Sequence, residues 1–89
     1  MPRAYDNAAQ AVCDYLTRKH KLPGKGKARE RRTRLGNLLN KSTHSVALYE
    51  RGKGGVTAAE LRAWCDRLDI VASCSADGWV VIAVDGEAP

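Results

Sequence analysis

The chain has few of the residues that build large apolar cores. Its 89 residues include no phenylalanine and one methionine, so a core has to form from leucine, valine, alanine, tyrosine and the two tryptophans. No apolar run approaches the roughly 20 residues that span a membrane. The first ten residues also lack the apolar centre of a secretory signal peptide. We therefore expect one small soluble domain over residues 1–89, inside the cell and without a membrane partner.

The cysteines are odd in number, and Cys13, Cys65 and Cys74 lie far apart in the chain. No CxxC pair and no nearby pair of histidines accompanies them, which argues against both a disulfide framework and a zinc site. We expect free thiols that are buried or half-buried, as small apolar residues usually are.

Motifs of catalysis are also absent. The sequence shows no paired carboxylates, no Ser-His-Asp set and no metal cluster, and residues 24–27, Gly-Lys-Gly-Lys, lack P-loop spacing. We therefore predict a protein that is not an enzyme and that uses no metal, no cofactor and no small-molecule effector.

Positive charge is concentrated in one segment. Residues 18–53 carry twelve Lys or Arg and only Glu30 and Glu50 as acids, whereas residues 54–89 carry six acids against Arg62 and Arg67. The middle of the chain is therefore suited to a polyanion and the C-terminal part is not. RNA is disfavoured as that polyanion, because the basic segment has no aromatic residues on which bases could stack.

Helical periodicity covers most of the first 68 residues. A first helix is predicted over residues 5–20, capped by Asp6 or Asn7. A glycine-containing break follows, and the basic segment after it favours helix from about Ala28 onward, with a mobile basic loop as the alternative. A capping box at residues 57–60 starts a core helix over residues 57–68, in which we expect Trp64 to pack beneath the preceding helices.

Residues 28–52 predict two helices joined by a tight turn. The first has leucines at helical spacing, Asn40 suits a left-handed turn residue, Ser42 and Thr43 suit an N-cap, and Gly52 suits the end of the second helix. Val46 and Tyr49 then face back onto Leu35 and Leu39, so the outward face carries small or polar side chains ringed by cations. Such a helix can enter the major groove of DNA while the cations hold phosphates. The positions that we expect to contact bases are Thr43, His44, Ser45, Ala47 and Leu48.

The run Leu35-Gly36-x-x-Leu39-Asn40-x-Ser42-x-x-x-Val46-x-x-Tyr49-Glu50-Arg51-Gly52 resembles the phage-repressor/Cro-type helix-turn-helix family (the XRE family). The resemblance covers roughly residues 31–70, and the basic segment upstream departs from the short turn usual there. It implies a cytoplasmic bacterial regulator, which a phage or plasmid can encode, that reads base edges with Thr43 and His44. The His44 contact has an alternative, an exposed polar residue of no consequence. Phosphate contacts are expected from Arg29, Arg31, Arg32, Thr33, Arg34, Lys41, Arg51 and Lys53.

The C-terminal residues 70–84 predict a β-hairpin, because Asp77-Gly78 lies between two strand-like runs. A two-residue turn there would pair Ala76 with Trp79 and Cys74 with Val81. Both faces of this hairpin are apolar, so one must be covered by something besides the helices, and the strand Trp79–Val84 has a free edge. Some regulators of the resembled family dimerise through such a strand, and the alternative is that both faces fold onto the chain's own helices. The predicted interface residues are Trp79, Val80, Ile82 and Val84.

Taken together, the sequence predicts a mainly α fold: a compact helical bundle with a helix-turn-helix, followed by a C-terminal β-hairpin. The expected function is a repressor that binds double-stranded DNA at a palindromic operator as a homodimer. The alternative is a protein-binding module, antitoxin-like or anti-activator, that acts through the apolar hairpin.

Overall fold

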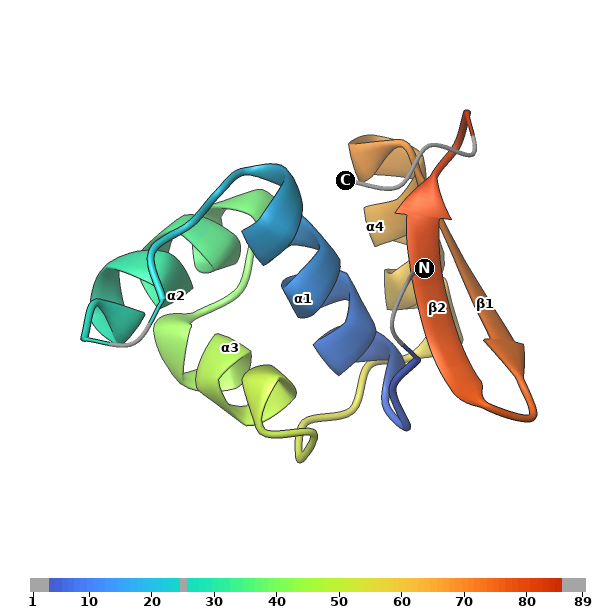
Figure 1. Cartoon of the computed structure of the whole chain (residues 1–89), viewed down its shortest axis with the longest axis horizontal. Helices are drawn as coiled ribbons and strands as arrows, with labels where there is room; N and C mark the ends of the chain where they lie inside the picture. The colour runs from blue at the N-terminus through green and yellow to red at the C-terminus, as the bar shows by residue number, and fades with distance from the viewer. Residues whose placement is uncertain (1–3, 25, 86–89) are drawn as a thin grey trace.

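The computed structural model of the chain describes residues 4–24 and 26–85. Within these residues the order is α1 (Ala8–Lys19), α2 (Ala28–Leu39), α3 (Thr43–Glu50), α4 (Ala58–Leu68), β1 (Ile70–Ser75) and β2 (Gly78–Ala83). The predicted mainly helical fold with a helix-turn-helix and a C-terminal hairpin is confirmed (Figure 1). No helix among the described residues is both long and apolar enough to cross a membrane.

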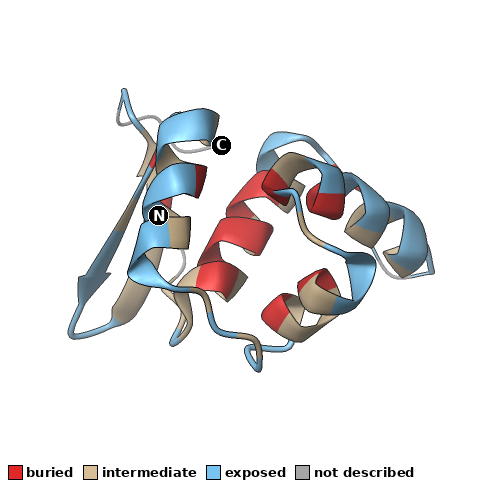
Figure 2. Cartoon of the chain, turned by 180° about the vertical axis from the view of Figure 1, so that it is seen from behind, coloured by how far each residue is buried: buried red, intermediate tan, exposed pale blue. Residues whose placement is uncertain are grey.

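Helix α1 forms the centre of the core. It lies between the α2–α3 pair and the hairpin, and it contacts α2, α3 and β2 (Figure 1). Six of its twelve residues are buried, so it is the most deeply buried helix in the view of Figure 2. On the far side of α1, α4 packs against β1. The side chains that fill the centre are Ala9, Val12, Cys13, Tyr15, Leu16, Leu35, Leu39, Val46, Trp64, Ile70 and Val81.

The helix ends follow the predicted capping signals. Asn7 caps α1 by accepting a hydrogen bond from the backbone N–H of Gln10, so the helix begins at residue 8 and not at residue 5. The basic segment is helical from Ala28, as favoured from its composition. Thr57 caps α4 by accepting from the N–H of Glu60. The Glu60 carboxylate, expected to return to this cap, pairs with Lys41 instead.

The hairpin register differs from the predicted one by two residues. Ser75 pairs with Gly78, Cys74 with Trp79 and Ala72 with Val81, so Ala76 and Asp77 form the turn. Gly78 lies directly after the turn and has to be glycine there, because its φ is +118° and a Cβ would lie 2.5 Å from the backbone O of Tyr5. A shift by two leaves every side chain on its predicted face, because side chains in a strand alternate with period two.

One edge of β2 is used within the chain. Tyr5 donates its N–H to the carbonyl O of Trp79 at 2.9 Å and accepts the Trp79 N–H at 2.5 Å. The backbone of Trp79, predicted to face a second copy, therefore already has partners. The opposite edge of the sheet is β1, which contains no charged residue.

The two faces of the hairpin differ in burial. Ile70 and Val81 are buried against α1 and α4 on the inner face. On the outer face the residue Val71 is 43% exposed, and Val84, just beyond β2, is 63% exposed. Val80 and Ile82 are half-buried on the same outer face. The helices thus cover one face, and the other carries apolar side chains in contact with water.

The three thiols are free, but their burial is not uniform. Cys13 is buried and Cys65 is half-buried, as predicted. Cys74 is exposed, and this corrects the prediction for it. Its position near the hairpin turn explains the exposure, because Ser73, Ser75, Ala76 and Asp77 around it are exposed as well.

Candidate nucleic-acid interface

The turn between α2 and α3 has the geometry that its residues predict. Asn40 ends α2 in the left-handed conformation, with φ 56° and ψ 48°, and its N–H donates to the carbonyl O of Gly36. The N–H of Lys41 donates to the same oxygen at 2.9 Å. Ser42 then caps α3 by accepting from the N–H of Ser45 at 3.1 Å. These bonds satisfy backbone groups that helix ends leave open and fix the angle between the two helices.

Gly36 allows this turn to pack closely against α2. A Cβ at this position would lie 2.5 Å from the backbone O of Lys41, which is far inside a normal contact distance. The small residue is therefore required by the approach of a backbone carbonyl and not by backbone dihedrals.

The predicted base-contacting residues lie along the accessible part of α3. Thr43 and His44 at the helix start are exposed, and Ser45, Ala47 and Leu48 are half-buried. Val46 and Tyr49 are buried on the opposite side against α1 and α2, as predicted. The hydroxyl of Ser45 already accepts a hydrogen bond from Ser42 at 3.2 Å. The two residues with the most open side chains are therefore Thr43 and His44.

The beginnings of α2 and α3 lie together around one cavity of about 330 Å³. Arg29 and Arg32 from α2 line it, together with Thr43, His44 and Ala47 from α3. Residues predicted separately to hold phosphates and to read bases are thus brought together, although they lie more than ten positions apart in the chain.

Glu50, at the end of α3, binds two of the predicted phosphate ligands. Its carboxylate accepts from Arg31 Nε at 2.6 Å and Nη2 at 3.2 Å, and from Arg32 Nε at 2.8 Å. Arg31 also donates from Nη1 to the carbonyl O of Pro23. Burial would raise the pKa of Glu50, but the hydrogen bonds from both arginines outweigh it, and the pKa is lowered. The same ion pair raises the pKa of Arg31.

The remaining predicted phosphate ligands fall into two groups. Lys41 pairs with Glu60, and Thr33 donates its hydroxyl to the carbonyl O of Arg29 at 2.9 Å. Four of the predicted phosphate ligands are exposed cations without an ion-pair partner among the described residues, so their charges are open to a ligand. These are Arg29, Arg34, Arg51 and Lys53.

Helix α4 holds the C-terminal end of α2 in place. Trp64 Nε1 donates to the carbonyl O of Leu39 at 3.2 Å, and Arg67 Nη2 donates to that of Leu38 at 2.8 Å. The ring of Trp64 also meets that of Tyr49 edge-on, with centroids 5.7 Å apart. The prediction that Trp64 packs beneath the helix-turn-helix is confirmed, and the indole also satisfies an open helix carbonyl.

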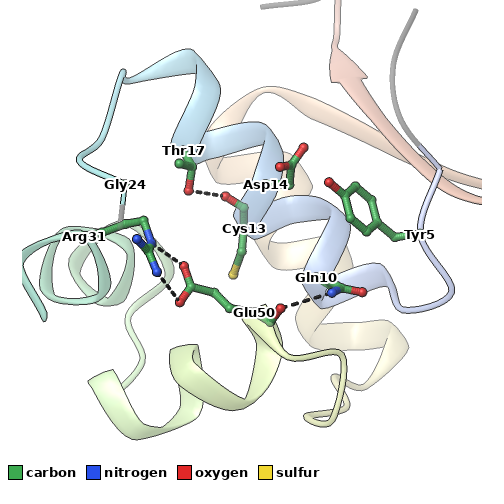
Figure 3. A pocket seen from close by; sticks show the side chains of 8 residues that line it. All are labelled: Tyr5, Gln10, Cys13, Asp14, Thr17, Gly24, Arg31 and Glu50. Atoms are coloured by element: carbon green, nitrogen blue, oxygen red, sulfur yellow. Dashed lines mark hydrogen bonds and ion pairs between the residues drawn. The ribbon is translucent and has the colours of Figure 1, made fainter. Parts of the chain in front are cut away.

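A second cavity of about 290 Å³ lies beside the Glu50 ion pairs (Figure 3). Gln10, Cys13 and Thr17 of α1 line it, with Arg31 and Glu50 opposite them. Burial raises the pKa of Cys13 to about 12, so its thiol stays protonated at neutral pH and is a poor nucleophile. This cavity could not be predicted from the sequence, because its lining comes from three helices, the N-terminal segment and the loop between α1 and α2.

The role of Glu50 is the main feature of the site that sequence reasoning missed. One signal was present: Glu50 is one of only two acids among residues 18–53, and a carboxylate among so many cations acquires partners. No three His, Cys, Asp or Glu side chains come together as a metal site in the part of the chain that the structure describes. Comparison of the chain with protein-family models, with curated proteins and with solved structures found no match.

Proposed function

We propose that this chain is a sequence-specific, double-stranded DNA-binding transcription regulator. The observation that carries the proposal is the cavity where Arg29 and Arg32 lie beside Thr43, His44 and Ala47. Cations hold the DNA backbone and fix the register, while short polar side chains on an exposed helix start reach base edges in the major groove. The separation of charge supports the same reading, because every cation of this cavity lies in the basic middle of the chain.

The mechanism of the proposed regulator is occupancy of its site. A two-fold dimer sets two copies of α3 in successive major grooves on one side of a palindromic operator, and RNA polymerase is excluded where operator and promoter overlap. Such a repressor acts in the cytoplasm or nucleoid of a bacterial cell. The uncovered apolar side chains Val71, Val80, Ile82 and Val84 are the proposed dimer contacts.

Selection of bound sequences from a random duplex pool tests the function directly. At near-physiological salt with competitor DNA, we expect a palindromic site whose half-sites are separated by about one helical turn, roughly 10 base pairs. Binding that enriches no sequence and vanishes as salt rises would contradict the proposal and leave only an electrostatic footprint.

Variants at the cavity should separate base reading from phosphate binding. We expect Thr43→Ala and His44→Ala to change the preferred bases, with about 1–3 kcal/mol of discrimination lost at the affected pair. Arg29→Ala should instead weaken binding to every sequence and reduce the slope of log K against log salt by about 0.9. Arg29 is a better test than Arg32, because Arg32 is held by Glu50. Equal losses on all sequences for both kinds of variant would place the recognition residues elsewhere.

The proposed dimer has its own test. A charge at Ile82 would face the apolar partner surface, so we expect Ile82→Asp to give monomers in sedimentation equilibrium with an unchanged far-UV circular dichroism spectrum. Ala63→Asp places the same charge on the exposed side of α4 and should leave the dimer intact. A dimer that survives Ile82→Asp would remove the hairpin from the interface.

One observation favours a second function, binding of another protein. An apolar groove of about 350 Å³ runs between α4 and β1, lined by Leu61, Cys65, Ile70, Ala72 and Trp79 among others. It adjoins the uncharged edge of β1, where an extended peptide could add as a strand. Weak, non-specific DNA binding together with tight binding of a protein would favour this antitoxin-like or anti-activator module.

A further inference from the structure

A second group of basic side chains lies away from the recognition cavity. His20 and Lys21 follow the end of α1, Arg34 lies in the middle of α2, and all three are exposed. None of them has an ion-pair partner among the described residues. We call these three residues, with the neighbouring Asn37, the α1–α2 cationic surface.

The surface is hollowed and rich in hydrogen-bond donors. His20, Arg34 and Asn37 line a cavity of about 270 Å³, together with Leu38. Guanidinium, imidazole and amide groups are the donors that proteins use for phosphate oxygens, and a guanidinium can bind two of them at once. The cavity therefore has the chemistry of a phosphodiester site.

The α1–α2 cationic surface faces a different direction from the recognition cavity. Arg34 lies five positions after Arg29 on the same helix, so the two side chains point roughly 140° apart at 3.6 residues per turn. Arg32, on the recognition side, is roughly 160° from Arg34 in the other direction. The side chain of Arg34 therefore points away from a straight duplex that lies against Arg29 and Arg32.

Contacts within the described residues do not account for the charge of Arg34. Arg18 pairs with Asp14, Lys19 lies 5.8 Å from the centroid of the Tyr15 ring, and both suit the negative end of the α1 dipole. Arg34 has no such partner, and its place in mid-helix gains nothing from a dipole. No acid occurs between Asp14 and Glu30, so nothing in that segment offsets the mutual repulsion of its cations.

We propose that the α1–α2 cationic surface binds the phosphate backbone of DNA outside the stretch that α3 reads. This inference rests on the proposed DNA-binding function. The phosphates can belong to the flank of the same duplex, bent around α2, or to a second duplex lying across it. Either contact adds affinity without adding sequence preference.

The test compares Arg34→Gln with Arg62→Gln. Both arginines are exposed, lie on helices and have no ion-pair partner among the described residues. Arg62, however, lies on α4, outside the α1–α2 cationic surface. The salt dependence of binding is measured on duplexes of about 20 and about 40 base pairs, the shorter one spanning two half-sites. If the flank is bound, Arg34→Gln lowers the slope by about 0.9 on the longer duplex only, and Arg62→Gln changes neither.

A second arm detects a second duplex. Protein is first bound to a bead-tethered duplex of about 20 base pairs, which is about two helical turns. A labelled duplex of the same length is then added, and its capture on the beads is measured. Several-fold loss of capture with Arg34→Gln but not with Arg62→Gln would support binding of a second duplex. The inference would be overturned if Arg34→Gln and Arg62→Gln gave the same salt slopes and the same capture of the labelled duplex. It would also be overturned if Arg34→Gln lowered the slope equally on the short and the long duplex.

Failure of the regulator proposal remains distinguishable from failure of this inference. Absence of a preferred sequence for the wild-type protein contradicts the regulator, whereas the slopes are compared on duplexes that carry the selected site. A protein that prefers one operator but shows no Arg34 effect contradicts the inference alone.

Discussion

Replacing Glu50 with glutamine is expected to lower the free energy of unfolding by about 2–3 kcal/mol. The amide keeps the shape of the side chain but removes the charge that binds Arg31 and Arg32. The side chains of Glu50 and Arg31 are both only 16% exposed, so the arginines left behind are poorly compensated by water. For a domain of this size, the melting temperature should fall by roughly 10 °C or more.

The effect of Glu50→Gln on the free energy of unfolding should depend on pH. Because the folded pKa of Glu50 is lowered, its ionised form contributes stability above the unfolded value of about 4.3. That contribution is lost as the pH falls through the folded pKa. The difference in unfolding free energy between the wild type and Glu50→Gln should therefore be full at neutral pH and shrink in acid.

Glu30→Gln is the matched control for Glu50→Gln. Glu30 is exposed in the first turn of α2 and has no ion-pair partner among the described residues, so only a favourable helix-dipole term of about 0.5 kcal/mol is removed. Equal destabilisation by the two variants, or a Glu50 effect that persists unchanged in acid, would mean that the ion pairs with Arg31 and Arg32 do not stabilise the fold.

Local signals in the sequence predicted the elements and their ends. Asn40, Ser42 and Thr57 each act on backbone groups within a few residues of themselves, and each does in the structure what its chemistry indicates. Helical spacing of apolar residues likewise predicted which side of α3 is buried. Such features depend on neighbours in the chain, which a sequence displays directly.

Contacts between distant segments could not be predicted from the sequence. A cation at position 31 or 32 looks the same whether it meets a phosphate or a carboxylate, and only the fold brings Glu50 within 3 Å of both arginines. At the hairpin, Tyr5 lies more than seventy positions away in the chain, yet its backbone pairs with Trp79 and occupies the space beside Gly78. In both cases the contact joins segments that are distant in the chain, which local sequence signals do not reveal.

The same limit applies to the candidate site. The exposed start of α3 could be predicted, because Val46 and Tyr49 fix which side is buried. The division of the cations into those free for a ligand and those used by the fold could not be predicted. Arg29 and Arg34 differ from Arg31 and Arg32 only in the direction they leave α2, and that direction matters only once α1 and α3 are placed around it.

Replacing Gly36 with valine is expected to be as damaging as the loss of Glu50, for a steric reason. A Cβ at this position would lie 2.5 Å from the carbonyl O of Lys41, and this oxygen belongs to the backbone of the turn and not to a movable side chain. Valine brings two further methyl groups into the same space. We expect a loss of about 3 kcal/mol in urea unfolding. The accompanying tilt of α3 away from α2 should also abolish preference for the selected DNA site.

Two control variants, Gly36→Ala and Gly24→Val, test whether the effect of Gly36→Val is steric. Alanine in mid-helix gains up to about 1 kcal/mol over glycine, so the clash is partly offset and Gly36→Ala should lie between the wild type and valine. Gly24 has nothing within 4 Å of its Cβ position, so valine there should change stability by no more than about 0.5 kcal/mol. If Gly36→Val unfolds at the same urea concentration as Gly24→Val, the Lys41 carbonyl does not contact α2 closely enough to exclude a side chain at position 36. In that case the angle between α2 and α3, on which the recognition cavity depends, is fixed by Glu50 and α4 alone.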